Sequence, residues 1–207
     1  MLAPIVAAQD GSRDRRTRSG QARRWSDPAG AARYRGSVPA SPRRRRLSAP
    51  ERARLDLRPR DRVLASVQLA DGTLAVASRL ALHVLDATTV ARTPWADVDH
   101  GTLDAPTRTL TVRWVWGATT ALTFAEDRAS VAFAQTFRER VQQSVIHTTS
   151  VPLPGGHRAR VALRRDEDGE LFSQVIADDS VDLADPQVAA LVDAAEDSVR
   201  DAAGLPR

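Results

Sequence analysis

The stretch RVLASVQLADGTLAVASRLALHVLD, residues 62–86, decides the fold of this chain. Hydrophobic and polar residues alternate over 63–70 and again over 80–84, and this period of two predicts half-buried β-strands. Asp71-Gly72 separates the first strand from a return strand at 73–78. That pair predicts a two-residue type I′ turn, in which both residues have positive φ. The stretch therefore predicts three antiparallel strands in direct succession.

Four further strands are expected at 90–95, 96–103, 109–116 and 119–124. The clearest is 109–116, where Trp114 and Trp116 fall on the same face as two aliphatic residues. Two tryptophans on one face predict a deep contact with the core. Pro94 places the strand at 90–95 at a sheet edge or a bulge, because proline has no N–H to donate.

The hydrophobic spacing changes to steps of three and four residues over 127–146, which predicts an amphipathic helix. A second unit follows, with strands at 158–165 and 170–177 around a turn at 166–169. Asp185-Pro186 then opens a last helix, with Asp as N-cap and Pro at the first helical position. The fold class expected is α+β: seven antiparallel strands as a barrel or sandwich, one capping helix, then a β-hairpin and a C-terminal helix.

Seven strands followed by one helix resemble the pleckstrin-homology-like (PH-like) superfold. The resemblance covers about residues 61–150 and is strongest with the uncharacterised PH-like proteins of actinobacteria. It rests on the hairpin around Asp71-Gly72, on the TPWADV segment at 93–98 and on the helix at 127–146. The resemblance implies a docking platform for a protein or peptide. The expected domains are an unfolded tail at 1–54, a PH-like domain at 55–150 and an extension at 151–207.

The first hairpin loop departs from the pattern of phosphoinositide-binding PH domains. Those domains carry several basic residues in a long first loop, whereas Asp71-Gly72 is short and acidic. Phosphoinositide binding is therefore not supported by the sequence.

Charge is divided unequally along the 207 residues. Residues 1–54 hold 14 Arg and 4 acidic residues, which gives +10, and the remaining 16 Arg and 22 acidic residues give −6. All 30 basic residues are arginine, which we attribute first to codon usage in a GC-rich genome. Cysteine is absent, which excludes disulfides and cysteine metal sites. A cytoplasmic location is expected.

The tail has its highest charge density at Arg43, Arg44, Arg45 and Arg46. One interpretation is an arm that contacts a polyanion, either nucleic acid or an anionic membrane surface. A second is a solvated, disordered segment. A third is a translation start placed too far upstream, so that part of the tail is never made. All three stay open, and any nucleic-acid binding is expected only through this tail.

We expect no enzyme activity, no catalytic residue, no cofactor site and no metal site. Asp97, Asp99 and His100 form the densest set of metal-ligating side chains, and a polar strand end explains them. His83 is expected to be a buried structural histidine. Asp166-Glu167-Asp168-Gly169 lacks the spacing of a calcium loop and is expected to be a turn. The function expected is a protein- or peptide-docking module, and the alternative is polyanion binding through the tail.

Overall fold

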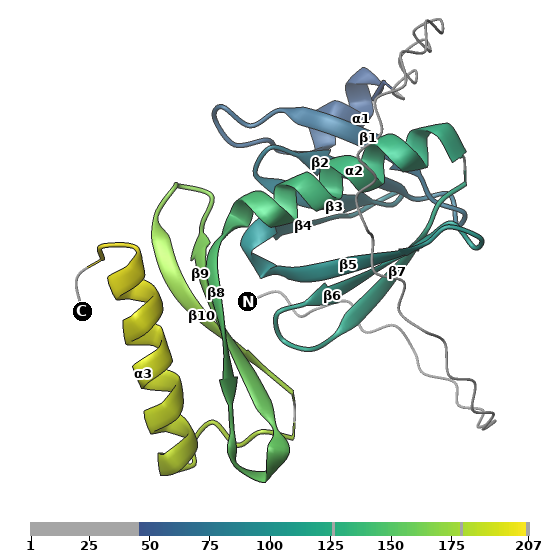
Figure 1. Ribbon diagram of the computed structural model, residues 1–207. Helices are drawn as coiled ribbons and strands as arrows, with labels where there is room; N and C mark the ends of the chain where they lie inside the picture. The colour runs from purple at the N-terminus through teal and green to yellow at the C-terminus, as the bar shows by residue number, and fades with distance from the viewer. Residues whose placement is uncertain (1–45, 126, 179, 206–207) are drawn as a thin grey trace, which may run out of the picture. The chain divides into compact units, whose positions relative to one another are not determined.

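Seven antiparallel strands follow one another in the computed structural model, which describes residues 46–125, 127–178 and 180–205. They are β1 (Val63–Gln68), β2 (Leu74–Ser78), β3 (Ala81–Leu85), β4 (Val90–Pro94), β5 (Val98–Asp104), β6 (Thr109–Trp114) and β7 (Thr119–Thr123). The first four form one sheet and the next three a second sheet, each in sequence order (Figure 1). All described residues belong to one compact unit. The seven predicted strands are therefore confirmed, except that residues 95–97 form a 3-10 helix and residues 115–116 lie beyond the end of β6.

The two sheets are open and do not form the single seven-stranded barrel that was expected. They meet at one corner, where Leu69 and Phe124 form an isolated antiparallel bridge. Between β4 and β5 the chain instead forms a short 3-10 helix, η1 (Trp95–Asp97). Pro94 ends β4 and has no N–H to offer a neighbouring strand, which favours this interruption.

The turn between β1 and β2 differs from the predicted type I′ geometry. Among the described residues the positive φ values at this turn are confined to Gly72, at 87°. The N–H of Leu69 donates to Thr73 at 2.8 Å and that of Gly72 donates to Leu69 at 3.0 Å. This is a three-residue loop that ends in a left-handed glycine, a common alternative to the two-residue turn. Asp71 instead binds the N–H and hydroxyl of Thr73 at 2.9 and 2.7 Å.

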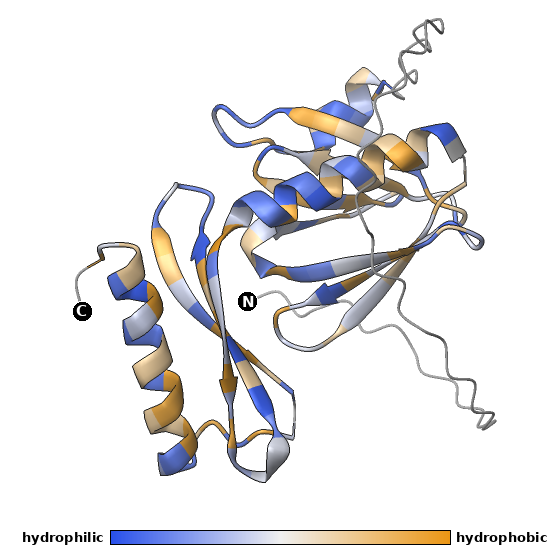
Figure 2. Ribbon diagram, viewed as in Figure 1, coloured by the Kyte–Doolittle hydropathy of each residue, from blue (hydrophilic) through white to orange (hydrophobic). Residues whose placement is uncertain are grey.

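The main core lies between the two sheets and helix α2 (Asp127–Ser144), which packs against β1, β2 and β5. Orange and blue bands alternate along this helix in Figure 2, as an amphipathic helix requires. Phe133 contacts Phe124 edge-on at 5.7 Å between ring centroids, and Phe137 contacts Trp95 in the same way at 5.6 Å. The close approach of α2 to β5 depends on Gly101, since a Cβ there would lie 2.5 Å from the Phe137 ring.

The deep contact expected for both tryptophans of 109–116 is wrong. Leu110 and Val112 are the buried residues of β6, and Trp114 is only partly buried. Trp116 lies beyond the end of β6 in the turn to β7 and is 52% exposed. The two indoles stack on each other, with centroids 5.4 Å apart and planes 7° apart.

A third sheet and a helix make up the C-terminal part. The strands are β8 (Val145–Pro152), β9 (Arg158–Arg165) and β10 (Leu171–Ala177), with η2 (Pro154–Gly156) between β8 and β9, and they pair in the order β10-β9-β8. The expected two-stranded hairpin is therefore a three-stranded sheet, and α2 ends two residues earlier than predicted because β8 begins there. Helix α3 (Pro186–Ala202) buries Val188, Val192 and Val199 against this sheet. Its predicted N-cap is confirmed, since Asp185 accepts from the N–H groups of residues 187 and 188.

Ordered structure begins before residue 55, where the tail was expected to end. Helix α1 (Ala49–Arg54) follows a capping box, in which Ser48 Oγ accepts from the N–H of Glu51 and Glu51 accepts from the N–H of Ser48. Next to this helix Leu55 packs with Leu74, Val76 and Leu85, on the second face of the four-stranded sheet. This helix was not predicted because it has only six residues and follows an arginine-rich stretch, where a capping box alone is a weak sequence signal.

Candidate functional site

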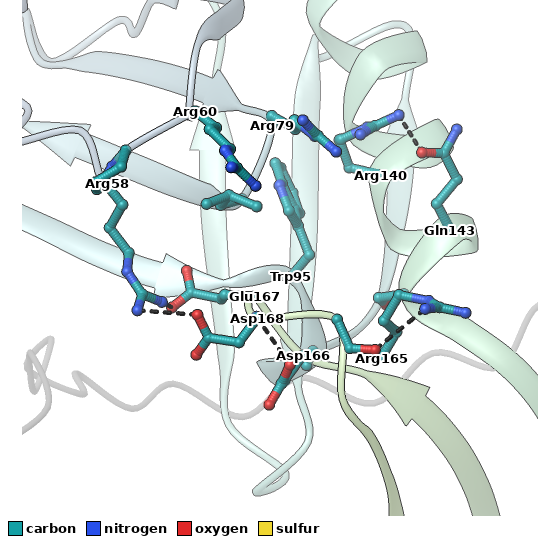
Figure 3. A pocket seen from close by; sticks show the side chains of 15 residues that line it. Arg58, Arg60, Arg79, Trp95, Arg140, Gln143, Arg165, Asp166, Glu167 and Asp168 are labelled. Carbon is teal, nitrogen blue, oxygen red and sulfur yellow. Dashed lines mark hydrogen bonds and ion pairs between the residues drawn. The ribbon is translucent and has the colours of Figure 1, made fainter.

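A cavity of about 690 Å³ opens between the four-stranded sheet, the end of α2 and the turn that joins β9 to β10. Its walls come from five separate segments of the chain, namely 58–60, 79–80, 95–96, 140–144 and 165–169. Trp95 and Ala96 of η1 line it beside the C-terminal turns of α2. We call this cavity the arginine pocket, because Arg58, Arg60, Arg79, Arg140 and Arg165 all line it (Figure 3).

The acidic turn at 166–169 forms one side of the arginine pocket, as Figure 3 shows. Asp166 holds the turn in shape, because its carboxylate accepts the N–H groups of Asp168 and Glu170, each at 2.9 Å. Gly169 has φ of 95°, which favours glycine at that position. The sequence prediction of a turn here is confirmed. The turn also forms ion pairs with arginines from distant parts of the chain, which its sequence did not reveal.

Glu167 and Asp168 neutralise two arginines of the four-stranded sheet and its flanking loop. Glu167 is bonded to Arg92 of β4, with one contact at 3.3 Å, and it accepts from Arg58 at 3.1 Å. Asp168 lies 3.1 Å from the other terminal nitrogen of Arg58. Arg165 donates to the carbonyl of Gly169 at 3.1 Å. The acidic residues of the pocket are therefore bound to arginines, at Glu167 and Asp168, or to backbone N–H groups, at Asp166.

The opposite side of the pocket carries positive charge that is not neutralised. Arg60, Arg79 and Arg140 make no ion pair with any carboxylate within the part of the chain that the structure describes. Figure 3 draws Arg60 to the left of Trp95 and Arg79 and Arg140 above and to the right of it, with the acidic turn below. An anion that entered the pocket would meet three guanidinium groups that have no ion-pair partner among the described residues.

The pKa of Arg140 reflects the positive charge and the burial around it. Burial lowers the pKa of Arg140, Glu139 opposes that shift, and the neighbouring charges of Arg79 and Arg62 lower it further. One terminal nitrogen donates to Gln143, and the buried Nε has no acceptor among the described residues. A buried donor without an acceptor is costly, which adds to the unfavourable surroundings of this guanidinium.

A second polar cluster lies inside the protein where β9 meets β5. Arg164 is 1% exposed and donates to the carbonyl of Val98 at 2.9 Å and to Ser144 Oγ at 3.2 Å. Its guanidinium also lies 3.9 Å from Asp99, whose carboxylate binds Arg160 and the Nδ1 of His100. Burial lowers the pKa of Arg164, and Asp99 opposes this shift. This cluster fastens the C-terminal sheet to the rest of the protein.

The same contacts account for the metal-ligating residue types at 97–100, so a bound metal is not needed to explain them. Asp99 is occupied by two arginines and a histidine, and burial raises the pKa of Asp97. Over residues 46–125, 127–178 and 180–205 there is no group of three metal-ligating side chains that could hold a metal ion.

His83, Ser78 and Asp61 contain the residue types of a hydrolytic triad but not its arrangement. Ser78 Oγ lies between the other two side chains, 3.2 Å from His83 Nε2 and 2.8 Å from Asp61. In a triad the histidine lies between the serine and the acid. His83 is fully buried, and burial lowers its pKa to about 4, with Arg92 adding to the shift. The expected burial of His83 is therefore confirmed.

The sequence-predicted contact residues Arg43, Arg44 and Arg45 lie outside the described residues, and Arg46 is exposed at their edge. The arginines of the pocket were missed because they lie up to 107 residues apart in sequence, at Arg58 and Arg165. Their one common sequence signal is the excess of arginine over lysine, which codon usage explains equally well.

Comparison with known proteins gives no matching family model, no matching curated protein and no matching solved structure. Within the described residues, no helix has both the length and the apolar character needed to cross a membrane.

Proposed function

We propose that this protein is a non-enzymatic docking module that binds an acidic segment of a partner protein in the arginine pocket. The observation that supports this proposal is the group of three guanidiniums, on Arg60, Arg79 and Arg140, that line one cavity without a carboxylate partner among the described residues. A partner that supplies carboxylates would replace water on these groups with charge-assisted hydrogen bonds.

The side chains around the pocket suit binding better than catalysis. Arginine stays protonated at neutral pH and cannot exchange a proton with a substrate. The acidic residues of the pocket are bound to arginines or to backbone N–H groups, which keeps them from acting as a general base. The pocket therefore offers fixed positive charge and hydrogen-bond donors, which are the properties of a recognition site.

We further propose that residues 63–144 are a divergent PH-like module. The support is the order of elements, with four antiparallel strands, three more and then one helix that packs on both sheets. The bridge between Leu69 and Phe124 also brings the first and last strands together, as closure of such a barrel would require. Binding of phosphoinositides at the first hairpin loop is not part of this proposal, because Asp71 makes that loop acidic.

The proposal is tested with a fluorescently labelled oligoglutamate peptide and the full-length protein, using fluorescence anisotropy at physiological salt. Substitution of Arg79 and Arg140 by glutamine should weaken binding by about tenfold or more, because each lost charge-assisted hydrogen bond contributes about 1.5–3 kcal/mol. Arg138→Gln is the matched control, since Arg138 lies on the same helix, is exposed and does not line the pocket. Equal affinity in the double variant and the wild type would contradict the proposal.

Polyanion binding through the tail stays the second candidate function, supported by the +10 charge of residues 1–54. Its test compares the binding of RNA, DNA and anionic vesicles across salt concentrations. Tail binding should decrease steeply with salt and be unaffected by the Arg79→Gln/Arg140→Gln double variant. The cytoplasmic location likewise stays a prediction.

A further inference from the structure

We infer that the arginine pocket takes a phosphorylated side chain of the partner protein, in preference to a glutamate or aspartate. This inference rests on the proposed docking function and names the chemical group that the pocket selects.

The uncompensated charge on the open side of the pocket exceeds what one carboxylate can neutralise. Arg60, Arg79 and Arg140 together carry three positive charges. Glu139 offsets part of the positive potential at Arg140, and Arg79 and Arg62 add to it. A phosphate monoester carries a charge of about −1.5 to −2 at neutral pH, whereas a carboxylate carries −1. The larger charge matches the larger number of guanidinium groups.

The donor geometry leads to the same group. A carboxylate has two oxygens, while a phosphate monoester has three terminal oxygens that can accept from several guanidiniums at once. Arg140 directs one terminal nitrogen to Gln143, so its other terminal nitrogen is the one left for a ligand. The terminal nitrogens of Arg60, Arg79 and Arg140 offer more donors than the two oxygens of a carboxylate can use, and the third oxygen of a phosphate adds a further acceptor.

The cavity has room for an esterified side chain and some of its backbone. Its volume of about 690 Å³ is within the usual range for pockets that bind a small molecule. Trp95 lines the pocket with an indole that is fixed on both sides: its N–H donates to the carbonyl of Ser78 at 3.1 Å, and its ring contacts Phe137. The wall beside the arginines is therefore rigid, which favours a ligand of defined shape.

The acidic turn on the other side of the pocket resembles a carboxylate ligand that the chain supplies itself. Glu167 lies between Arg58 and Arg92 in the way that an acidic partner would lie between two guanidiniums. Arg60, Arg79 and Arg140 have no such internal carboxylate in the described part of the chain. The contrast indicates that the open side is kept for a ligand from outside.

Three short peptides test the inference. Each has a central residue flanked by two glutamates on either side, and that residue is serine in the first, glutamate in the second and phosphoserine in the third. Their affinities for the full-length protein are measured by competition against the labelled oligoglutamate peptide. The phosphoserine peptide should bind about tenfold more tightly than the glutamate peptide. Arg140→Gln and Arg79→Gln should each remove most of this advantage, and Arg138→Gln should leave it unchanged.

The other outcomes separate failure of the inference from failure of the docking proposal. Equal binding of the glutamate and phosphoserine peptides, with both weakened by Arg140→Gln, would overturn the phosphate preference and leave docking intact. Binding that no pocket variant alters would overturn both. Binding of vesicles that contain phosphatidic acid through Arg79 and Arg140, without preference for the phosphoserine peptide, would assign the site to a lipid and overturn the inference.

Discussion

Arg92 of β4 is paired with Glu167, which lies 75 residues further along the chain in the turn between β9 and β10. The same carboxylate accepts from Arg58 at 3.1 Å. The side chain of Glu167 is 15% exposed, so this contact is better shielded from solvent than a typical surface ion pair. It joins the C-terminal sheet to the four-stranded sheet and sets one wall of the arginine pocket.

Replacement of Glu167 by glutamine should lower the free energy of unfolding by about 1–2 kcal/mol, since two charge-assisted hydrogen bonds become weaker. Urea denaturation measures this change. Asp168→Asn is the control, because the Asp168 side chain is 68% exposed and its pair with Arg58 should contribute less than about 0.5 kcal/mol. Equal losses in the two variants would mean that Glu167 does not hold the turn in place.

The buried Arg164 should be the most important polar residue for stability. Arg164→Met keeps much of the volume but leaves the carbonyl of Val98 without this donor and Asp99 with less positive charge nearby. Loss of one partner in such a buried cluster costs about 3 kcal/mol. The neighbouring Arg165 is exposed, so Arg165→Gln should change stability by about 0.5 kcal/mol or less. Full stability of Arg164→Met in thermal and urea unfolding would show that hydrophobic packing alone fastens the C-terminal sheet.

His83 should make the protein less stable in mild acid. Its pKa is about 4 in the folded protein against an ordinary value of 6.5, so protonation favours the unfolded chain. The stability is complete above the ordinary value and decreases as the pH falls below it, with a loss of about 2 kcal/mol at pH 5. His83→Gln should remove this part of the pH dependence in urea denaturation series. Parallel profiles for the wild type and His83→Gln would contradict the assignment.

The stacked tryptophans should contribute unequally to stability. Trp114 is partly buried against the main core, and its indole N–H donates to Thr120 at 2.9 Å, so Trp114→Ala should cost about 2–3 kcal/mol. Trp116 is mostly exposed and loses mainly the stacking contact, so Trp116→Ala should cost about 1 kcal/mol or less. Thermal unfolding of both variants checks this order. A larger loss of stability for Trp116→Ala than for Trp114→Ala would contradict this order. It would mean that Trp116 contributes more than its stacking contact with Trp114.

Much of the fold could be predicted because its strands and helices carry local signals. The alternation at 63–70, the three- and four-residue steps of α2 and the cap at Asp185 all depend on neighbouring residues. The strand β8 was missed because Val145 continues the hydrophobic spacing of Val141 on α2. Pairing with β9, and not the local pattern, makes the segment a strand.

The arginine pocket could not be predicted, because its residues come together only through tertiary structure. Arg79 follows β2, Arg140 lies in the last turns of α2 and Arg60 lies in a loop with φ of 68°. Each alone is typical of a solvated arginine. The division of the strands into two sheets was also hidden, because alternation shows that a strand has one buried face but does not specify its neighbour.

The most direct measurement follows the indole N–H signal of Trp95 in proton–nitrogen correlation spectra while the oligoglutamate peptide is added to the full-length protein. Trp95 lines the arginine pocket, Trp114 and Trp116 do not, and Trp25 belongs to the tail, so each signal reports on its own part of the chain. We predict a saturable shift of the Trp95 signal that the Arg79→Gln/Arg140→Gln double variant abolishes. A shift of Trp25 alone, with Trp95 unchanged at saturating peptide, would contradict docking in the pocket.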